Sequence, residues 1–294
     1  MNSTQQLPKY LYRIYNKTIS IDFDIPFLPK LAANTSYQIE ITENKDIFNC
    51  EFEDGYALDK NKAFYSKNSL IQTCHNKKGR IEYFLNNTLS NYDKAFKLLS
   101  HPMALSLFHD KKYVLHSSAV EINNKAYIFL GPSGSGKSYT VNALLKYGKL
   151  ITEDVLSCFY KNGSFYATPS IPVIKLEKKE PINYVNKFEI EGDTRNRKGY
   201  VLNNFDFENT PVKIEGCFIL QENEIIHLAK CDDDEAFRNL FLNSFCALPK
   251  NQCIQSEKNL LRNISEFISS QNIYKYSRKK NHDINSLLKF LNIM

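Results

Sequence analysis

Gly131-Pro-Ser-Gly-Ser-Gly-Lys-Ser138 has the form G-x-x-x-x-G-K-[ST], which is typical of a phosphate-binding loop. An apolar run, Ala126–Leu130, precedes it, and a helical pattern, Tyr139–Lys146, follows it. A strand that feeds a glycine-rich turn and opens a helix directs backbone N–H groups and the positive end of the helix dipole at one point. The sequence therefore predicts that the chain binds the phosphates of a nucleoside triphosphate.

Each residue type in this segment has an expected role. The glycines permit a tight turn and a close approach of phosphate, and the Ser138 hydroxyl is placed to ligate Mg²⁺. Lys137 is expected to be an exposed donor that reaches the β- and γ-phosphates. We expect these residues to contact ATP: Gly131, Ser133, Gly134, Ser135, Gly136, Lys137, Ser138 and Tyr139.

The strand that enters the loop has an unusual predicted partner. Tyr113–Ile122 reads as one strand, Asn123 and Asn124 offer a hairpin turn, and Lys125–Leu130 returns antiparallel to it. A doubly wound nucleotide-binding fold would instead enter its loop from a parallel sheet with helical crossovers. The pattern therefore predicts a mixed sheet around the loop.

Two acids and a histidine are the candidate catalytic groups. Glu153 and Asp154 follow a short predicted strand, and neighbouring side chains at a strand end point in opposite directions, so one acid can face the γ-phosphate and the other the metal or the interior. His116 can hydrogen-bond a carboxylate and orient it. The alternatives are an ordinary acidic turn and a structural histidine.

A cluster of cations lies in the polar segment 181–211, which we expect to be a surface loop near the site. Arg195, Arg197 and Lys198 are candidates to clamp phosphate or an anionic substrate. The alternative is that they are simply solvated.

Composition indicates a globular chain in a reducing compartment. The 294 residues are 43% apolar and carry a net charge of +6, which is mild for this length and argues against nucleic acid as a partner. The seven cysteines form no C-x-x-C pair. With no long apolar stretch and no signal-peptide pattern at the N-terminus, we expect a cytoplasmic protein without a membrane partner.

The chain divides into two predicted parts. Residues 1–104 read mainly as an antiparallel β region with alternating strands at Thr18–Asp24 and Ser36–Thr42 and a weaker one at Ile47–Phe52. A helical segment from Asn91 to Phe108 follows these strands and crosses the boundary. Residues 105–294 form the second domain, which contains the phosphate loop. The predicted fold class is mixed α/β or α+β.

Three segments together resemble a known family. His116-Ser-Ser-Ala-Val120, the loop Gly131–Ser138, and Leu150-Ile-Thr-Glu-Asp154 occur in the order found in the HPr kinase/phosphorylase family. The pattern is most similar to its HPr-kinase-like branch, which includes the lasso-peptide kinases, and it covers roughly residues 105–291.

This resemblance implies a phosphate-loop kinase core related to ATP-dependent carboxykinases, with a mixed sheet and flanking helices. It implies that Lys137 binds phosphate, that Ser138 and Glu153 hold Mg²⁺, and that one acid of the pair, which we assign to Asp154, acts as base with support from His116. The family usually has two aspartates where this chain has Glu153 and Asp154. No segment matches the one used for phosphorolysis, so the resemblance implies kinase activity alone.

The acceptor and two other classes of function stay open. A serine of a peptide or small protein is the expected acceptor, and a small hydroxyl metabolite is the alternative. Glu215–Glu222 also reads as an apolar strand that ends in an acid, as in an ATPase or GTPase switch. Gln221, however, stands where that acid is usual. Because Glu153 stands where the family usually has an aspartate, a nucleotide-binding pseudokinase remains an alternative. The sequence does not decide between ATP, GTP and pyrophosphate as donor, nor whether the chain forms a homo-oligomer.

Overall fold

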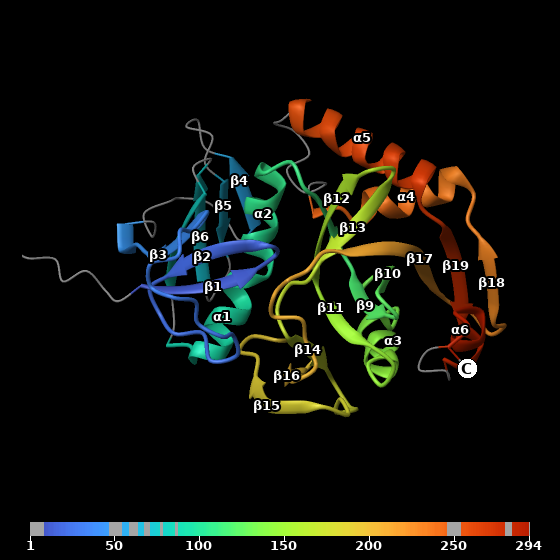
Figure 1. Cartoon of the computed structure of the whole chain (residues 1–294), viewed down its shortest axis with the longest axis horizontal. Coiled ribbons are helices and arrows are strands. Elements are labelled where there is room, and N and C mark those ends of the chain that lie inside the picture. Colours follow the sequence, from blue (N-terminus) through green and yellow to red (C-terminus); the bar gives the residue numbers. More distant parts are fainter. Residues whose placement is uncertain are drawn as a thin grey trace, which may run out of the picture.

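Two large β-sheets lie along the long axis of this computed structural model, and helices α1 (Asn91–Leu99) and α2 (His101–His109) lie between them (Figure 1). The structure describes residues 9–46, 55–58, 64–67, 71–76, 79–85, 88–245, 254–279 and 284–293. Helix α2 contacts strands of both sheets, so the helical pair joins the two parts of the molecule.

The N-terminal sheet has the order β1-β2-β3-β7-β6-β5-β4. Its strands are β1 (Tyr10–Ile14), β2 (Lys17–Ile21), β3 (Ile39–Glu43), β4 (Gly55–Leu58), β5 (Phe64–Lys67), β6 (Ile71–Asn76) and β7 (Arg80–Leu85). The expectation of a purely antiparallel sheet is wrong, because β3 runs parallel to both β2 and β7. The long connection between β2 and β3 allows this crossover. The predicted strand at Ile47–Phe52 lies outside the described residues.

The central sheet holds the phosphate loop and follows the path β11-β9-β10-β17-β13-β12-β8, with β19 and β18 continuing from β17. Its strands are β8 (Tyr113–His116), β9 (Ser118–Ile122), β10 (Lys125–Leu130), β11 (Lys149–Thr152), β12 (Val155–Lys161), β13 (Ser164–Thr168), β17 (Val212–Glu222), β18 (His227–Lys230) and β19 (Ile273–Arg278). Strand β10 pairs antiparallel with β9, as predicted, and parallel with β17. The predicted mixed sheet is confirmed.

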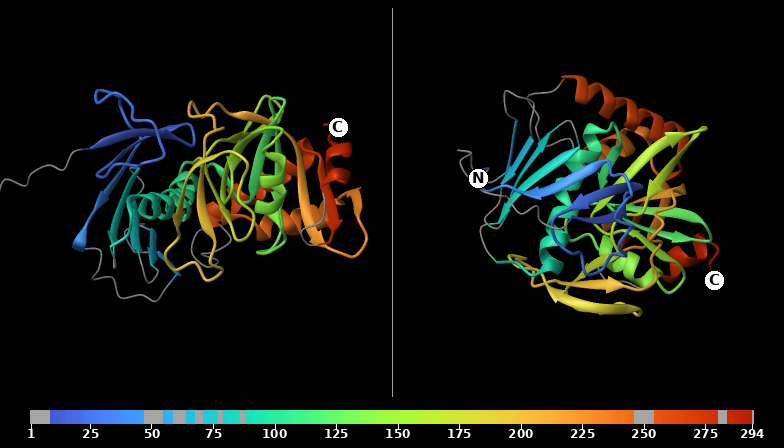
Figure 2. Two further views of the ribbon diagram at one scale, coloured as in Figure 1. Left: turned by 90° about the horizontal axis from the view of Figure 1, so that it is seen from below. Right: turned by 60° about the vertical axis from the view of Figure 1, so that its left-hand side comes forward.

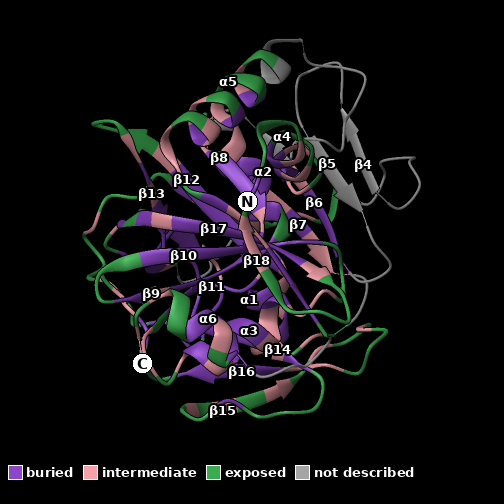
Figure 3. Cartoon of the chain, turned by 90° about the vertical axis from the view of Figure 1, so that its right-hand side faces the viewer, coloured by how far each residue is buried: buried purple, intermediate pink, exposed green. Residues whose placement is uncertain are grey.

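Helices cover both faces of the central sheet (Figure 2). They are α3 (Lys137–Leu144), α4 (Asp233–Leu242), α5 (Ile254–Ser270) and α6 (Asn285–Phe290). Strand β10 shows the division, since Ile128 packs with α4 and α5 on one face, whereas Phe129 packs with α3 and α6 on the other. Figure 3 shows the resulting buried centre at β10 and β17 and the exposed outer side of α5.

Two predicted elements are each split in the structure. The helical segment from Asn91 breaks at Ser100, whose backbone (φ −91°, ψ −111°) is not helical; Pro102, in the first turn of α2, lacks an N–H and suits a helix start rather than an interior. The predicted strand Tyr113–Ile122 breaks at Ser117 into β8 and β9, which join different partners. The Ser117 N–H donates instead to the Asp154 carbonyl, at 3.1 Å.

A third, small sheet of order β14-β16-β15 stands beside the phosphate loop. Its strands are β14 (Val173–Leu176), β15 (Tyr184–Glu189) and β16 (Lys198–Leu202). The expectation that residues 181–211 form only a surface loop is therefore wrong. Phe188 packs against Phe96 and Tyr92 of α1, which gives this polar segment enough apolar contact to form strands.

The cysteines and the lengths of the helices can be compared with what the composition predicts. Three buried cysteines in the described part of the chain, Cys158, Cys217 and Cys231, are free. No helix among the described residues combines the length and apolar character needed to cross a membrane.

Candidate functional site

The phosphate loop connects β10 to α3, as the motif predicts. Gly131 and Gly136 have φ values of +143° and +90°, in the region that favours glycine. A Cβ on Gly131 would lie 2.9 Å from the Leu220 carbonyl oxygen, and one on Gly136 would lie 2.7 Å from Arg278 Nη2. Backbone shape therefore requires glycine at both positions, and at Gly131 the close backbone of β17 requires it as well.

Lys137 is buried rather than exposed, which corrects the expectation. It is 8% exposed, and its Nζ donates to the Gly131 carbonyl at 2.8 Å and the Pro132 carbonyl at 3.3 Å. Burial lowers the pKa of Lys137. The ammonium thus lies folded over its own loop, where an incoming anion would meet it.

The two acids occupy the bend between β11 and β12, and their backbone is fixed by β9. Ser118 Oγ donates to the Glu153 carbonyl at 2.9 Å. The Glu153 carboxylate accepts a hydrogen bond of 2.6 Å from Ser138 Oγ, at the start of α3. The Asp154 carboxylate lies 3.1 Å from His116 Nδ1, at the end of β8. The structure thus brings together the four side chains that the motifs suggested.

Lys175, on β14, completes the cluster and was missed by sequence reasoning. Its Nζ lies 3.1 Å from Asp154 Oδ2 and 3.5 Å from Glu153 Oε2, and the side chain is 10% exposed. The signal was a lysine inside the apolar run Val173-Ile-Lys-Leu176. A lysine buried there needs carboxylate partners.

Charge and burial act differently on the two acids. Burial alone would raise the pKa of Asp154, but Lys175 and His116 outweigh it and hold that pKa well below its usual range. For Glu153, burial dominates over the attraction of Lys175 and raises the pKa. Asp154 is therefore the more strongly ionised member of the pair.

The predicted cation cluster is only partly assembled at the site. Arg195 Nη2 donates to Ser133 Oγ of the phosphate loop, at 2.8 Å. Arg197 is paired with Asp193, at 2.6 Å, and attracts both acids from a longer range. Lys198 instead pairs with exposed Glu189, at 2.7 Å, and its place in a phosphate clamp stays a prediction.

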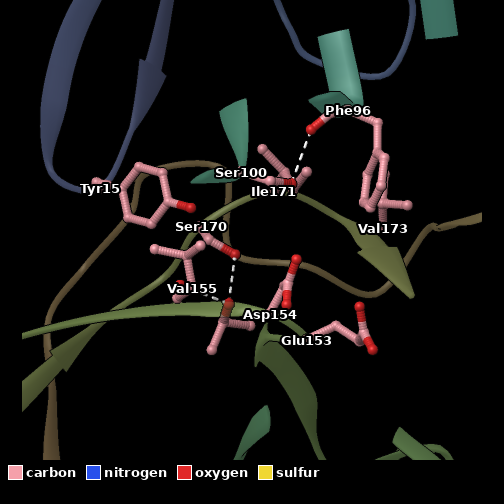
Figure 4. Close-up of a pocket in the computed structure, with 10 residues that line it drawn as sticks. Tyr15, Phe96, Ser100, Glu153, Asp154, Val155, Ser170, Ile171 and Val173 are labelled. Carbon is pink, nitrogen blue, oxygen red and sulfur yellow. Dashed lines mark hydrogen bonds between the residues drawn. The ribbon is translucent and has the colours of Figure 1, made fainter. Parts of the chain in front are cut away.

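A small pocket, partly open to solvent, lies beside Asp154 (Figure 4). It is lined by residues of the central sheet and of the N-terminal part: Tyr15, Phe96, Ser100, Thr152, Glu153, Asp154, Val155, Ser170, Ile171 and Val173. Tyr15, in the turn between β1 and β2, donates through its hydroxyl to the Leu99 carbonyl at 3.1 Å. The first hundred residues thus form one wall of the site.

The remaining predicted nucleotide contacts lie where the motif places them. Gly134 has open space where a Cβ would be, Ser135 carries a buried hydroxyl without a hydrogen-bond partner, and Tyr139 is half-buried in the first turn of α3. Nothing in the described part of the chain groups three His, Cys, Asp or Glu side chains into a metal site.

Comparisons with known proteins give a distant structural likeness. No family model matches the chain, and no curated protein matches it. Among solved structures, the Hpr(Ser) kinase/phosphatase from Coxiella burnetii is 11% identical, with a TM-score of 0.31 over 61% of this chain and 91% of that chain. This is a distant structural similarity, and it assigns no family to the chain.

Proposed function

We propose that this protein is an ATP-dependent kinase that transfers the γ-phosphate to a hydroxyl acceptor, most simply a serine of a peptide or small protein. One observation carries the proposal: Asp154, ionised and hydrogen-bonded to His116, stands next to Glu153, which is hydrogen-bonded to Ser138 of the phosphate loop. An acceptor-orienting carboxylate beside a phosphate-binding loop is the arrangement that phosphoryl transfer needs.

The residues present fit Mg²⁺ and a triphosphate. Ser138 Oγ and Glu153 Oε1 are oxygen ligands, the type that Mg²⁺ prefers, and the buried Glu153 Oε2 has no hydrogen-bond partner. With so few protein ligands, Mg²⁺ would also be held by phosphate and water, as is common for this ion. When bound, Mg²⁺ would neutralise charge on the phosphates. Lys137 would leave the carbonyls of its own loop to bind phosphate.

Asp154 would orient the acceptor more than it would pull its proton. A carboxylate with a depressed pKa is a weak base, but a loose transition state needs little proton transfer early in the reaction. The acceptor oxygen bonds to the γ-phosphorus, the bond from that phosphorus to the β-bridging oxygen breaks, and ADP leaves. The hydroxyl proton goes to Asp154 and then to solvent through His116, which is 40% exposed.

The arrangement of Gln221 favours a kinase over an ATPase switch. Strand β17 runs parallel to β10, so its C-terminal end reaches the phosphate loop. There Gln221 Nε2 donates to Glu235 of α4 at 3.0 Å, and the side chain is engaged away from the loop. Gln221 thus stands where a water-activating acid is usual, and its amide is held by Glu235, whereas Asp154 lines the pocket described above.

Acceptor dependence tests the proposal. ADP formation would be measured with Mg²⁺ and labelled ATP, with and without serine-containing peptides, carrier proteins or small alcohols, and modified acceptors would be located by mass spectrometry. We expect ADP to form only with an acceptor. Asp154→Asn should lower transfer by about 10²-fold or more while retaining ATP-induced thermal stabilisation.

Two other outcomes would reject the proposal that this protein is a kinase. Label released only as free phosphate, at the same rate with and without acceptors, would indicate an ATPase. Stabilisation by ATP with little ADP formed under either condition would indicate a pseudokinase. Glu153→Gln, which should weaken the dependence on Mg²⁺ instead, serves as the comparison for Asp154→Asn.

A further inference from the structure

A buried arginine stands directly behind the phosphate loop. Arg278, the last residue of β19, is 2% exposed. Its Nη2 donates to Thr140 Oγ1 at 2.7 Å and to the Gly136 carbonyl at 3.3 Å, and its Nη1 donates to the Lys279 carbonyl at 3.2 Å. The guanidinium therefore touches the last glycine of the loop and the first turn of α3.

Among the residues that the structure describes, no nearby acid balances the charge of this arginine. Within the described ranges, no carboxylate lies within 4.0 Å of Arg278, and its buried Nε has no hydrogen-bond partner. Burial lowers the pKa of Arg278, and this outweighs the opposing influence of Tyr276, Tyr139 and, least, Glu222, its register partner on β17. A buried cation without a counter-charge is costly, so its retention here calls for a reason.

Three sources of positive potential meet at this loop. Arg278 lies behind it, the Lys137 ammonium folds over it, and the N-terminus of α3 adds partial positive charge. In the free protein these sources repel one another, whereas an anion bound at the loop would be attracted by all of them.

We infer that Arg278 is a positioning residue of the phosphate site, and that the phosphates of a bound nucleotide supply its missing counter-charge. The inference rests on the nucleotide binding in the proposed function. Arg278 holds the Gly136 carbonyl and Thr140 from behind, which leaves the loop amides free to face the ligand. The same contact places Arg278 Nη2 where it would lie 2.7 Å from a Cβ on Gly136.

A purely structural role for Arg278 makes the opposite prediction for stability. If the arginine only pins the loop to β19, its removal should lower the melting temperature of the free protein and leave ligand binding little changed. If its charge is unbalanced without ligand, an apolar replacement of similar length should leave the free protein as stable or more stable, and should weaken nucleotide binding.

The test uses the full chain with MgADP as the probe, which needs no acceptor. For Arg278→Met we expect an unchanged or higher melting temperature without ligand, a dissociation constant for MgADP raised about tenfold or more, and a smaller MgADP-induced shift. Arg278→Lys, which keeps the charge, should retain more of the affinity. Arg262→Met, at an exposed arginine paired with Glu266 on α5, removes the same charge and should change neither quantity.

Each outcome decides the inference. A lower melting temperature with an undiminished MgADP shift would show a structural pin and overturn it. If Arg278→Met does not fold, Arg278→Gln, which keeps hydrogen bonding without charge, decides by the same two readouts. If the wild type shows no MgADP stabilisation and Lys137→Ala behaves identically, nucleotide binding itself fails and the inference falls with it. If the wild type binds MgADP and Arg278→Met binds it with the same affinity, the inference about Arg278 is rejected and the proposed nucleotide binding still stands.

Discussion

At the scale of single residues, Lys175 compensates the negative charge of the two carboxylates at the site. Glu153 and Asp154 are adjacent and largely buried, and two carboxylates so close together repel each other. The Lys175 ammonium lies between them, beneath the ring of Phe96, which is 5.3 Å from Nζ. Because the lysine is itself buried, neither it nor the acids could carry a charge in isolation without a cost in folding free energy.

Lys175→Met should therefore damage stability and transfer together. Removing one partner of a buried charged cluster typically costs about 3–5 kcal/mol, because the remaining charges are left uncompensated. Asp154 is held below its ordinary pKa in the wild type, so it adds stability at neutral pH that is lost as the pH falls through its folded-state pKa. Denaturant unfolding of the variant should accordingly lose less stability on acidification than that of the wild type.

Lys187→Met provides the matched control for this change. Lys187 is half-exposed on β15 and pairs with Glu180 at 3.1 Å, so its loss should change the free energy of unfolding little. Equal stability and equal pH dependence in Lys175→Met and wild type would show that Lys175 does not hold the acids.

The sequence located most of these residues because each belongs to a local motif. Ser138 follows from the glycine-rich loop, and Glu153 and Asp154 from a strand end. Lys175 carries no motif, since its role depends on β14 lying against a bend whose Asp154 stands 21 residues earlier in the chain. The burial of Lys137 could not be predicted either, because it results from the ammonium folding onto carbonyls of its own loop.

At the scale of elements, the sequence predicted strands and helices better than their ends. Lys125–Leu130 and the helix after the loop follow from apolar pattern and glycine position. Residues 181–211 were misread because their polar outer face hides a hairpin whose few apolar side chains pack against α1. That hairpin also explains why Lys198 pairs with Glu189, since the alternation of side chains along the strand directs Lys198 to Glu189 rather than toward the phosphate loop.

The turn between β15 and β16 should act through Arg195. Arg195→Ala removes the contact with Ser133 and should lower transfer about tenfold or more, because a cation aimed at the phosphate site acts mainly on charge that develops during transfer. Lys198→Ala should stay within about twofold of wild type, because an exposed pair contributes little. Single-turnover transfer from labelled ATP, with ATP affinity measured separately, distinguishes the two. An equal loss in both variants would argue for a general charge effect instead.

At the scale of the whole molecule, the N-terminal sheet and the central sheet share a core. One buried cluster contains Ile41 and Ile81 of the N-terminal sheet together with Val155, Val173 and Phe245 from beyond residue 105. The predicted boundary between residues 104 and 105 falls inside α2. Such long-range packing leaves no trace in local periodicity, so the two-domain division stays a prediction.

The shared core predicts that the chain unfolds as one unit. Ile41→Ala, at a fully buried position on β3, should lower the free energy of unfolding by about 2–5 kcal/mol. If unfolding is cooperative, calorimetry should show a single transition, and MgADP bound at the distant phosphate loop should raise its temperature in both variant and wild type. Two independent domains would behave differently: Ile41→Ala would create a separate early transition that MgADP does not move. Ile225→Ala, at a largely exposed position after β17, is the control and should leave the transition unchanged because it removes no core contact.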